Sequence, residues 1–203
     1  MTELDKALAD IGDIRARMAA GTTFQGFGPM VIAVTGILAA ALCTLQYNVP
    51  TVFASSTKSY LIAWLALACV CALLIGIEMV ARSRRIHGGL ADAMLANAVE
   101  QFLPAAVGGI MLTVVIFRFQ SELMWMLPGL WQLLLSVGLF ASARNLVRSV
   151  KLVAGWYFVC SFVVLVLSTN VGSLSPLFMA VPFVIGQLMM ALVLKYSGES
   201  HNE

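Results

Sequence analysis

Charged residues are scarce in this chain. Only 11% of its 203 residues are Asp, Glu, Lys or Arg, whereas 61% are hydrophobic and the mean hydropathy is +0.94. Soluble domains carry about 25% charged residues, so this composition excludes soluble catalytic domains. Apolar stretches recur along the whole length and leave no room for a separate soluble domain. The sequence therefore predicts a single membrane domain, with no direct nucleic-acid binding.

Histidine and cysteine are also few, and their positions argue against the usual cofactor sites. The two histidines, His87 and His201, lie in a predicted loop and in the tail, so they cannot both ligate a haem inside a bundle. Cys69 and Cys71 are two residues apart, which turns them to nearly opposite sides of a helix. No phosphate-binding loop, dinucleotide fingerprint, nucleophile elbow or His-Glu-x-x-His motif occurs. We therefore expect no cofactor, no metal site and no enzymatic activity.

Six apolar segments are long enough to cross a bilayer, which needs about 20 mainly apolar residues. This pattern predicts an all-α polytopic membrane protein with six transmembrane helices. The predicted spans cover about residues 29–46, 61–81, 98–117, 126–143, 152–168 and 176–194. We expect residues 1–21 to form a cytoplasmic amphipathic helix and residues 22–203 to form the six-helix membrane domain.

Basic residues are distributed unevenly between the two sides of the membrane. With six spans both termini share one side, and ten of the twelve Lys and Arg residues fall there. The other two are Lys58 and Arg118. Because Lys and Arg concentrate in cytoplasmic loops, this split predicts that both termini are cytoplasmic.

The segment before the first span has helical periodicity. Its apolar residues, which would lie on one face, are Leu4, Leu8, Ile11, Ile14 and Met18. Such a helix would lie on the membrane or against the bundle. Alternatively, it would be a docking surface for a cytoplasmic partner.

The stretch GIEMVARSRR, residues 76–85, places a glutamate inside an apolar run. Glu78 is three residues from the end of the second predicted span, about one turn below the cytoplasmic interface. Arg82 follows at i+4, in the favourable order of acid before base. A local ion pair is therefore one interpretation. The other is intramembrane proton or ion handling, because ionisable residues within spans are often functional.

Glu100 and Gln101 lie at a similar depth, where the third span begins. Together with nearby basic residues they form a predicted group that we call the rim cluster: Glu78, Arg82, Arg85, Glu100, Gln101, Arg144 and Arg148. Such a cluster would bind an anionic lipid head group, a ligand or a protein partner. Alternatively, it would be a structural ion-pair network that orders the helices.

Deeper polar residues are few, and Gln132 and Gln187 are the main candidates. Hydrogen bonds of this kind typically hold membrane helices together. Pro104 and Pro182 each precede a glycine by four residues. Such a shared pattern would suit a three-plus-three transporter repeat, although the rest of the two halves does not visibly match.

Aromatic and small residues make two further predictions. Tyr47, Tyr60 and Trp125 lie near predicted span ends, where such rings serve as interfacial anchors. Pairs of small residues, such as Gly36 with Ala40, favour close helix packing. The same faces would also support a homo-oligomer.

Four segments resemble a group of small bacterial six-span inner-membrane proteins with no assigned activity. They are DIRARMAAGTTFQGFGP, QFLPAAVGG, LPGLWQLLLSVGLFASAR and SPLFMAVPFVIGQLMMALVLKY. The resemblance implies a bacterial inner-membrane location. It also implies a regulatory or sensory pairing with a cytoplasmic winged-helix protein, because members are often encoded beside one.

These observations lead to two functional hypotheses. In the first, the protein is a noncatalytic sensor, anchor or regulatory partner that acts through its cytoplasmic surface, in contact with membrane lipids. In the second, it is a small transporter or channel for a lipophilic or lipid-like substrate.

Overall fold

A computed structural model describes residue 5 and residues 27–87, 91–143, 149–170 and 174–199, and every element in these ranges is a helix. The elements are α2 (Pro29–Asn48), α3 (Pro50–Phe53), α4 (Thr57–His87), α5 (Ala91–Phe119), the 3₁₀ helix η2 (Ser121–Met126), α6 (Leu127–Ser142), α7 (Val150–Asn170) and α8 (Leu177–Glu199). Six helical segments within these ranges are long and apolar enough to cross a membrane, with η2 and α6 together forming one. The predicted all-α polytopic fold is confirmed. The predicted amphipathic helix over 1–21 lies outside the described residues, apart from residue 5.

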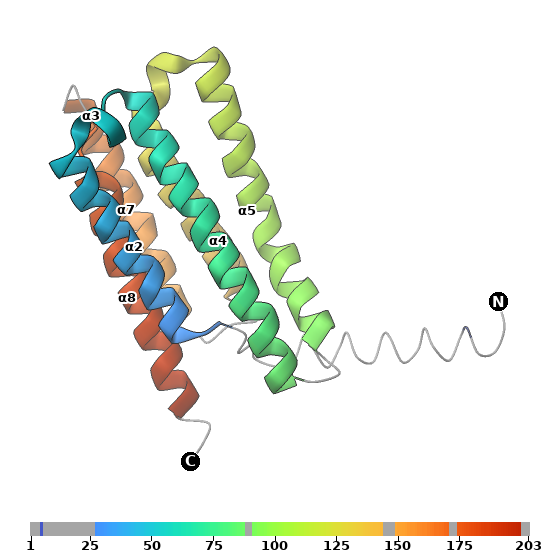
Figure 1. The fold of residues 1–203 in the computed structure, drawn as a ribbon. Coiled ribbons are helices and arrows are strands. Elements are labelled where there is room, and N and C mark those ends of the chain that lie inside the picture. The colour runs from blue at the N-terminus through green and yellow to red at the C-terminus, as the bar shows by residue number, and fades with distance from the viewer. Residues whose placement is uncertain (1–4, 6–26, 88–90, 144–148, 171–173, 200–203) are drawn as a thin grey trace.

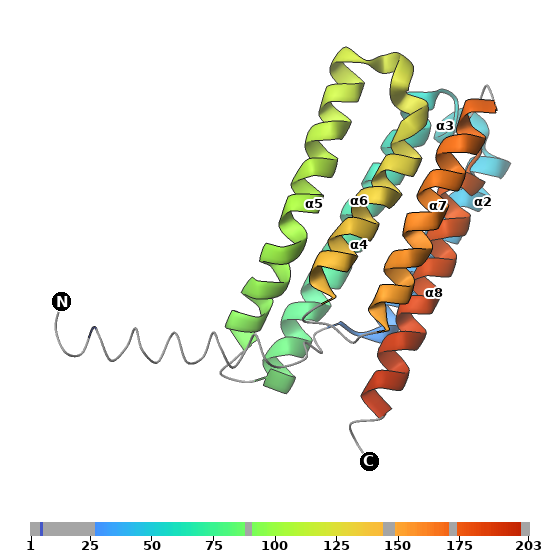
Figure 2. The ribbon, with the colours of Figure 1, turned by 180° about the vertical axis from the view of Figure 1, so that it is seen from behind.

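The six long helices form an up-and-down bundle (Figures 1 and 2). Each contacts its neighbour along the chain, and α2 packs against α8, which brings the first and last spans together. Proline in the first turn begins α2, α3 and α6, where its missing N–H costs no helical hydrogen bond. The C-terminal ends of α4 and α8 lie at the same end of the bundle. We call this the Arg-rich end, because Arg82, Arg84 and Arg85 lie there.

Two buried apolar clusters lie along the bundle. One includes Tyr60, Trp64 and Leu127. The other includes Val153 and Tyr157. Tyr60 is only 2% exposed, so its predicted role as an interfacial anchor is wrong. The ring packs among buried residues of other helices, such as Leu42 and Leu127, and its hydroxyl donates to the Ser175 carbonyl oxygen.

The helices α4 and α5 differ from the other four in length and burial. They have 31 and 29 residues. These lengths correspond to about 46 and 43 Å at 1.5 Å per residue, against about 30 Å of hydrocarbon. Only 22% and 11% of their most apolar windows are buried, compared with 33% to 39% in the other spans. The α4–α5 hairpin is therefore the least buried part of the bundle, and it is long enough to extend beyond the bilayer core.

Candidate functional site

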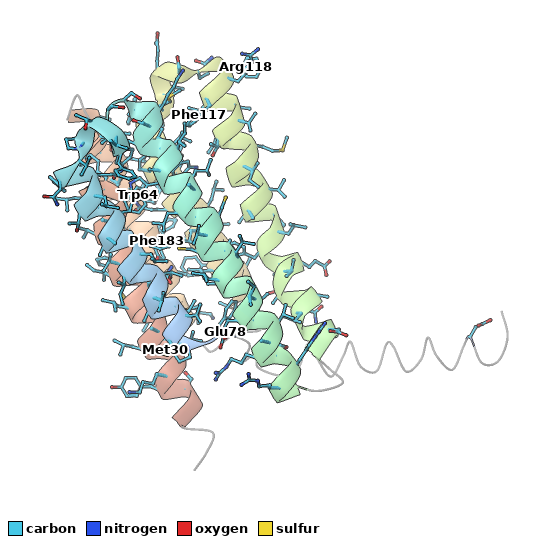
Figure 3. All side chains as sticks on the ribbon, in the orientation of Figure 1. Met30, Trp64, Glu78, Phe117, Arg118 and Phe183 are labelled. Carbon is cyan, nitrogen blue, oxygen red and sulfur yellow. The ribbon has the colours of Figure 1, made fainter. Side chains whose placement is uncertain are left out.

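Glu78 faces the beginning of the first membrane helix. A Cβ atom added to Gly28 would lie 2.7 Å from Oε1 and 3.0 Å from Cγ of Glu78. Figure 3 shows Glu78 on the side of α4 towards this end of α2. Gly28 is the N-cap of α2 and has no side chain to cap it. A carboxylate near a helix N-terminus interacts favourably with the helix dipole, typically by about 0.3–1 kcal/mol. The structure thus indicates a structural role for Glu78 that the local sequence did not predict.

Glu100 and Gln101 lie on the neighbouring helix α5, in different surroundings from Glu78. Glu100 is exposed, and Gln101 is half-buried. Glu78 is turned towards α2, whereas α5 lies on the other side of α4 (Figure 1). The structure therefore does not bring the two carboxylates into one pocket.

The basic members of the rim cluster are only partly described. Arg82 is half-buried and Arg85 is exposed, both on the last turns of α4. Arg144 and Arg148 lie outside the described residues. The ion pair between Glu78 and Arg82, and ligand binding by the whole cluster, stay predictions.

Gln132 contacts a break in the hydrogen bonding of α8. Pro182 has no N–H, so the carbonyl oxygen of Phe178, four residues earlier, loses its usual helical partner. Nε2 of Gln132 donates a hydrogen bond to this oxygen, with a donor–acceptor distance of 2.8 Å. A side chain of α6 therefore satisfies the group that the proline leaves free, as membrane helices require.

Two side chains of α7 donate to the same two turns of α8, and Gln187, itself on α8, donates to one of them. Nε1 of Trp156 donates to the Pro182 carbonyl oxygen at 2.9 Å, and the Tyr157 hydroxyl donates to the Phe183 carbonyl oxygen at 3.5 Å. Nε2 of Gln187 donates to the Tyr157 hydroxyl oxygen at 3.5 Å. We call Gln132, Trp156, Tyr157 and Gln187 the α8 clasp.

Gly186 allows the α8 clasp to close. A Cβ atom at this position would overlap the ring and hydroxyl of Tyr157, which is 1% exposed. The two candidate intramembrane residues, Gln132 and Gln187, thus belong to one structure around Pro182. The members of the clasp are neutral, and their hydrogen bonds join α6, α7 and α8. Neutral hydrogen bonds of this kind hold neighbouring membrane helices together.

A second polar group lies at the end of the bundle away from the Arg-rich end. The sequence analysis did not predict it. Nε1 of Trp64 donates to Oε1 of Gln46 at 3.0 Å, and Nε2 of Gln46 donates to the Phe53 carbonyl oxygen at 3.3 Å. The Tyr60 hydroxyl donates to the Ser175 carbonyl oxygen at 3.2 Å. Gln46 ends the first predicted span, so a surface position seemed natural. In the structure its partners on α3 and α4 enclose it, and it is 2% exposed.

Metal-binding residues do not cluster in the described part of the chain: no three His, Cys, Asp or Glu side chains lie there in a group that could hold an ion.

The chain was compared with known proteins, and no family model, curated protein or solved structure matches it. The fold defines the class, which is a multi-pass α-helical membrane protein. The resemblance to small bacterial six-span proteins stays a prediction.

Proposed function

We propose that the protein is a noncatalytic component of a bacterial inner membrane, acting as an anchor or regulatory partner through its Arg-rich end. One observation carries this proposal. The helices of the α4–α5 hairpin are longer than the bilayer core is thick. Arg84 and Arg85 near the end of α4, and Asp92 at the start of α5, are exposed. Exposed charges on helix ends beyond the hydrocarbon are accessible to a soluble protein.

The distribution of polar groups supports the same proposal. In the described residues, the charged side chains within the spans lie towards the helix ends, with Glu78 and Glu100 the deepest at the Arg-rich end. The deeper Gln132, Trp156 and Gln187 each donate a hydrogen bond to a backbone oxygen or to the Tyr157 hydroxyl. An ion pathway would favour a charged or strongly polar series across the membrane midplane.

Orientation is the first test of this proposal. A reporter that fluoresces only in the cytoplasm, fused after Glu203, should be active, and a reporter active only in the periplasm should be silent. The opposite result would place the Arg-rich end outside and overturn a cytoplasmic docking role.

Partner binding is the second test. The tagged full chain is purified in mild detergent and bound proteins are identified by mass spectrometry. The double substitution Arg84→Glu and Arg85→Glu should remove a cytoplasmic partner, such as a winged-helix regulator. Lys58→Glu at the other end serves as the matched control and should retain it. Removal of Met1 to Ala20 tests whether the predicted N-terminal helix contributes to partner binding. A partner set that survives every change would contradict docking at this end.

The second candidate function is transport of a lipophilic or lipid-like substrate. The observation that favours it is an apolar groove between α5 and α6. Flux of a fluorescent lipid analogue across proteoliposomes tests this idea. Glu78→Gln and Glu100→Gln test coupling, and flux that neither variant changes would exclude both carboxylates from it.

A further inference from the structure

An apolar groove of about 160 Å³ lies between α5 and α6. Its walls are Phe102, Ala105, Ala106 and Gly109 on α5, and Trp131, Leu134 and Leu135 on α6. All seven residues are half-buried, so the groove is open to the surroundings of the bundle. Figure 2 shows the two helices side by side.

The depth of the groove decides what surrounds it. A charged side chain is costly inside the hydrocarbon, so Glu100 marks its edge on α5 at the Arg-rich end. Phe102 and Gly109 follow about 3 and 13 Å further along the helix axis, at 1.5 Å per residue. The hydrocarbon of one leaflet is about 15 Å thick, so the groove lies in the leaflet at the Arg-rich end. The chemistry available at this depth is that of a lipid chain.

A polar mouth adjoins the apolar groove. Gln101, Ala105 and Gly109 follow one another at intervals of four residues, so they share one face of α5. The last two line the groove, and Gln101 therefore lies one turn nearer the Arg-rich end. Its Oε1 atom is buried and has no hydrogen-bond partner. Glu100, the adjacent residue, presents an exposed carboxylate at the same depth.

We propose that this groove and its mouth bind a phospholipid with a primary ammonium headgroup, of the phosphatidylethanolamine type. One acyl chain lies along the groove. The ammonium group donates hydrogen bonds to Oε1 of Gln101 and to the Glu100 carboxylate. A primary ammonium has three donors and a positive charge, which complement an amide oxygen beside a carboxylate.

Native mass spectrometry of the purified full chain tests the proposal. The detergent contains equal amounts of dioleoyl phosphatidylethanolamine and dioleoyl phosphatidylcholine. The two lipids have the same chains and net charge, but the quaternary ammonium of phosphatidylcholine has no N–H donor. We expect about ten-fold preferential retention of phosphatidylethanolamine, which corresponds to about 1.4 kcal/mol. Equal retention of the two lipids would overturn the proposal.

Variants locate the site. Gln101→Leu and Glu100→Gln should each reduce the preference towards one, and Glu100 is exposed, so its substitution should leave the fold intact. Ala106→Phe should fill the groove and reduce retention of both lipids. Ala68→Phe, on an exposed side of α4, is the control and should change neither lipid. A wild-type preference that persists in both mouth variants would place the lipid elsewhere and contradict this assignment.

Discussion

The helices α5 and α8 contain the same proline–glycine spacing in opposite surroundings. Pro104 is exposed on α5, whereas Pro182 is buried in α8. A Cβ atom on Gly108 would find its nearest neighbour, Cδ2 of Leu134, at 3.9 Å, whereas one on Gly186 would overlap Tyr157. One motif therefore lies on the least buried hairpin, and the other is the part of α8 that the side chains of the α8 clasp contact.

The comparison bears on the idea of a transporter repeat. A repeat would place the two motifs in equivalent environments, with comparable partners for the freed carbonyl groups. Instead, donors from α6 and α7 converge on α8, while Pro104 faces outwards. The shared spacing is thus no support for a three-plus-three architecture. It shows that identical helix-breaking residues acquire their roles from neighbouring helices.

The largest predicted effect is that of Gly186→Ala. The added methyl group meets the buried ring of Tyr157, which has no room to move, so we expect destabilisation by about 3 kcal/mol, at the upper end of overpacking costs. Unfolding of the purified protein in mixed micelles with increasing dodecyl sulfate measures it. Gly108→Ala is the matched control and should cost nothing. Equal destabilisation by the two substitutions would show that the two proline–glycine motifs are packed alike.

Gly138→Ala tests a close contact between the hairpin and α6. A Cβ atom here would lie 2.5 Å from the Phe102 ring and 3.1 Å from Cβ of Ala105. Because Phe102 is half-buried and can partly turn away, we expect about 2 kcal/mol of destabilisation. The same unfolding assay measures the loss, and limited proteolysis should show earlier cleavage around α5. An unchanged cleavage pattern would mean that this contact does not hold the hairpin.

Gln132→Leu tests the repair of the proline break. Loss of the hydrogen bond to the Phe178 carbonyl oxygen should cost about 1 kcal/mol, within the range for such bonds in membranes. In a Pro182→Ala background the restored backbone N–H takes over that oxygen, so the same substitution should cost clearly less. A double-mutant cycle measures the difference. Strict additivity would show that Gln132 does not compensate for the proline.

The smallest effect is expected for Gly76→Ala on α4. No atom lies within 4 Å of a Cβ added to this position. Alanine favours a helix over glycine by about 1 kcal/mol in water, so we expect a slight stabilisation or no change. The midpoint of unfolding checks this. A marked loss of stability in detergent would point to a contact with another molecule at this face.

Hydropathy was sufficient to predict the six spans. A span must bury about 20 apolar residues in lipid whatever its neighbours are, so each is recognisable from its own segment. The role of Glu78 was not predictable, because its neighbour Gly28 is remote in the chain and glycine carries no signal of a partner. Gln132 likewise acts on an oxygen 46 residues away. Tyr60 was misplaced because its position near a span end gave no indication that its ring packs among residues of other helices.

The sequence by itself determined that this protein is an α-helical, multi-pass membrane protein, since hydrophobicity and helix length are local properties. It also marked where α8 loses a backbone hydrogen bond, because proline lacks an N–H wherever it occurs. Only the tertiary structure decided which of the two proline–glycine motifs is held, and by which side chains. That choice depends on how helices far apart in the chain pack together, and hydropathy is insensitive to such pairing.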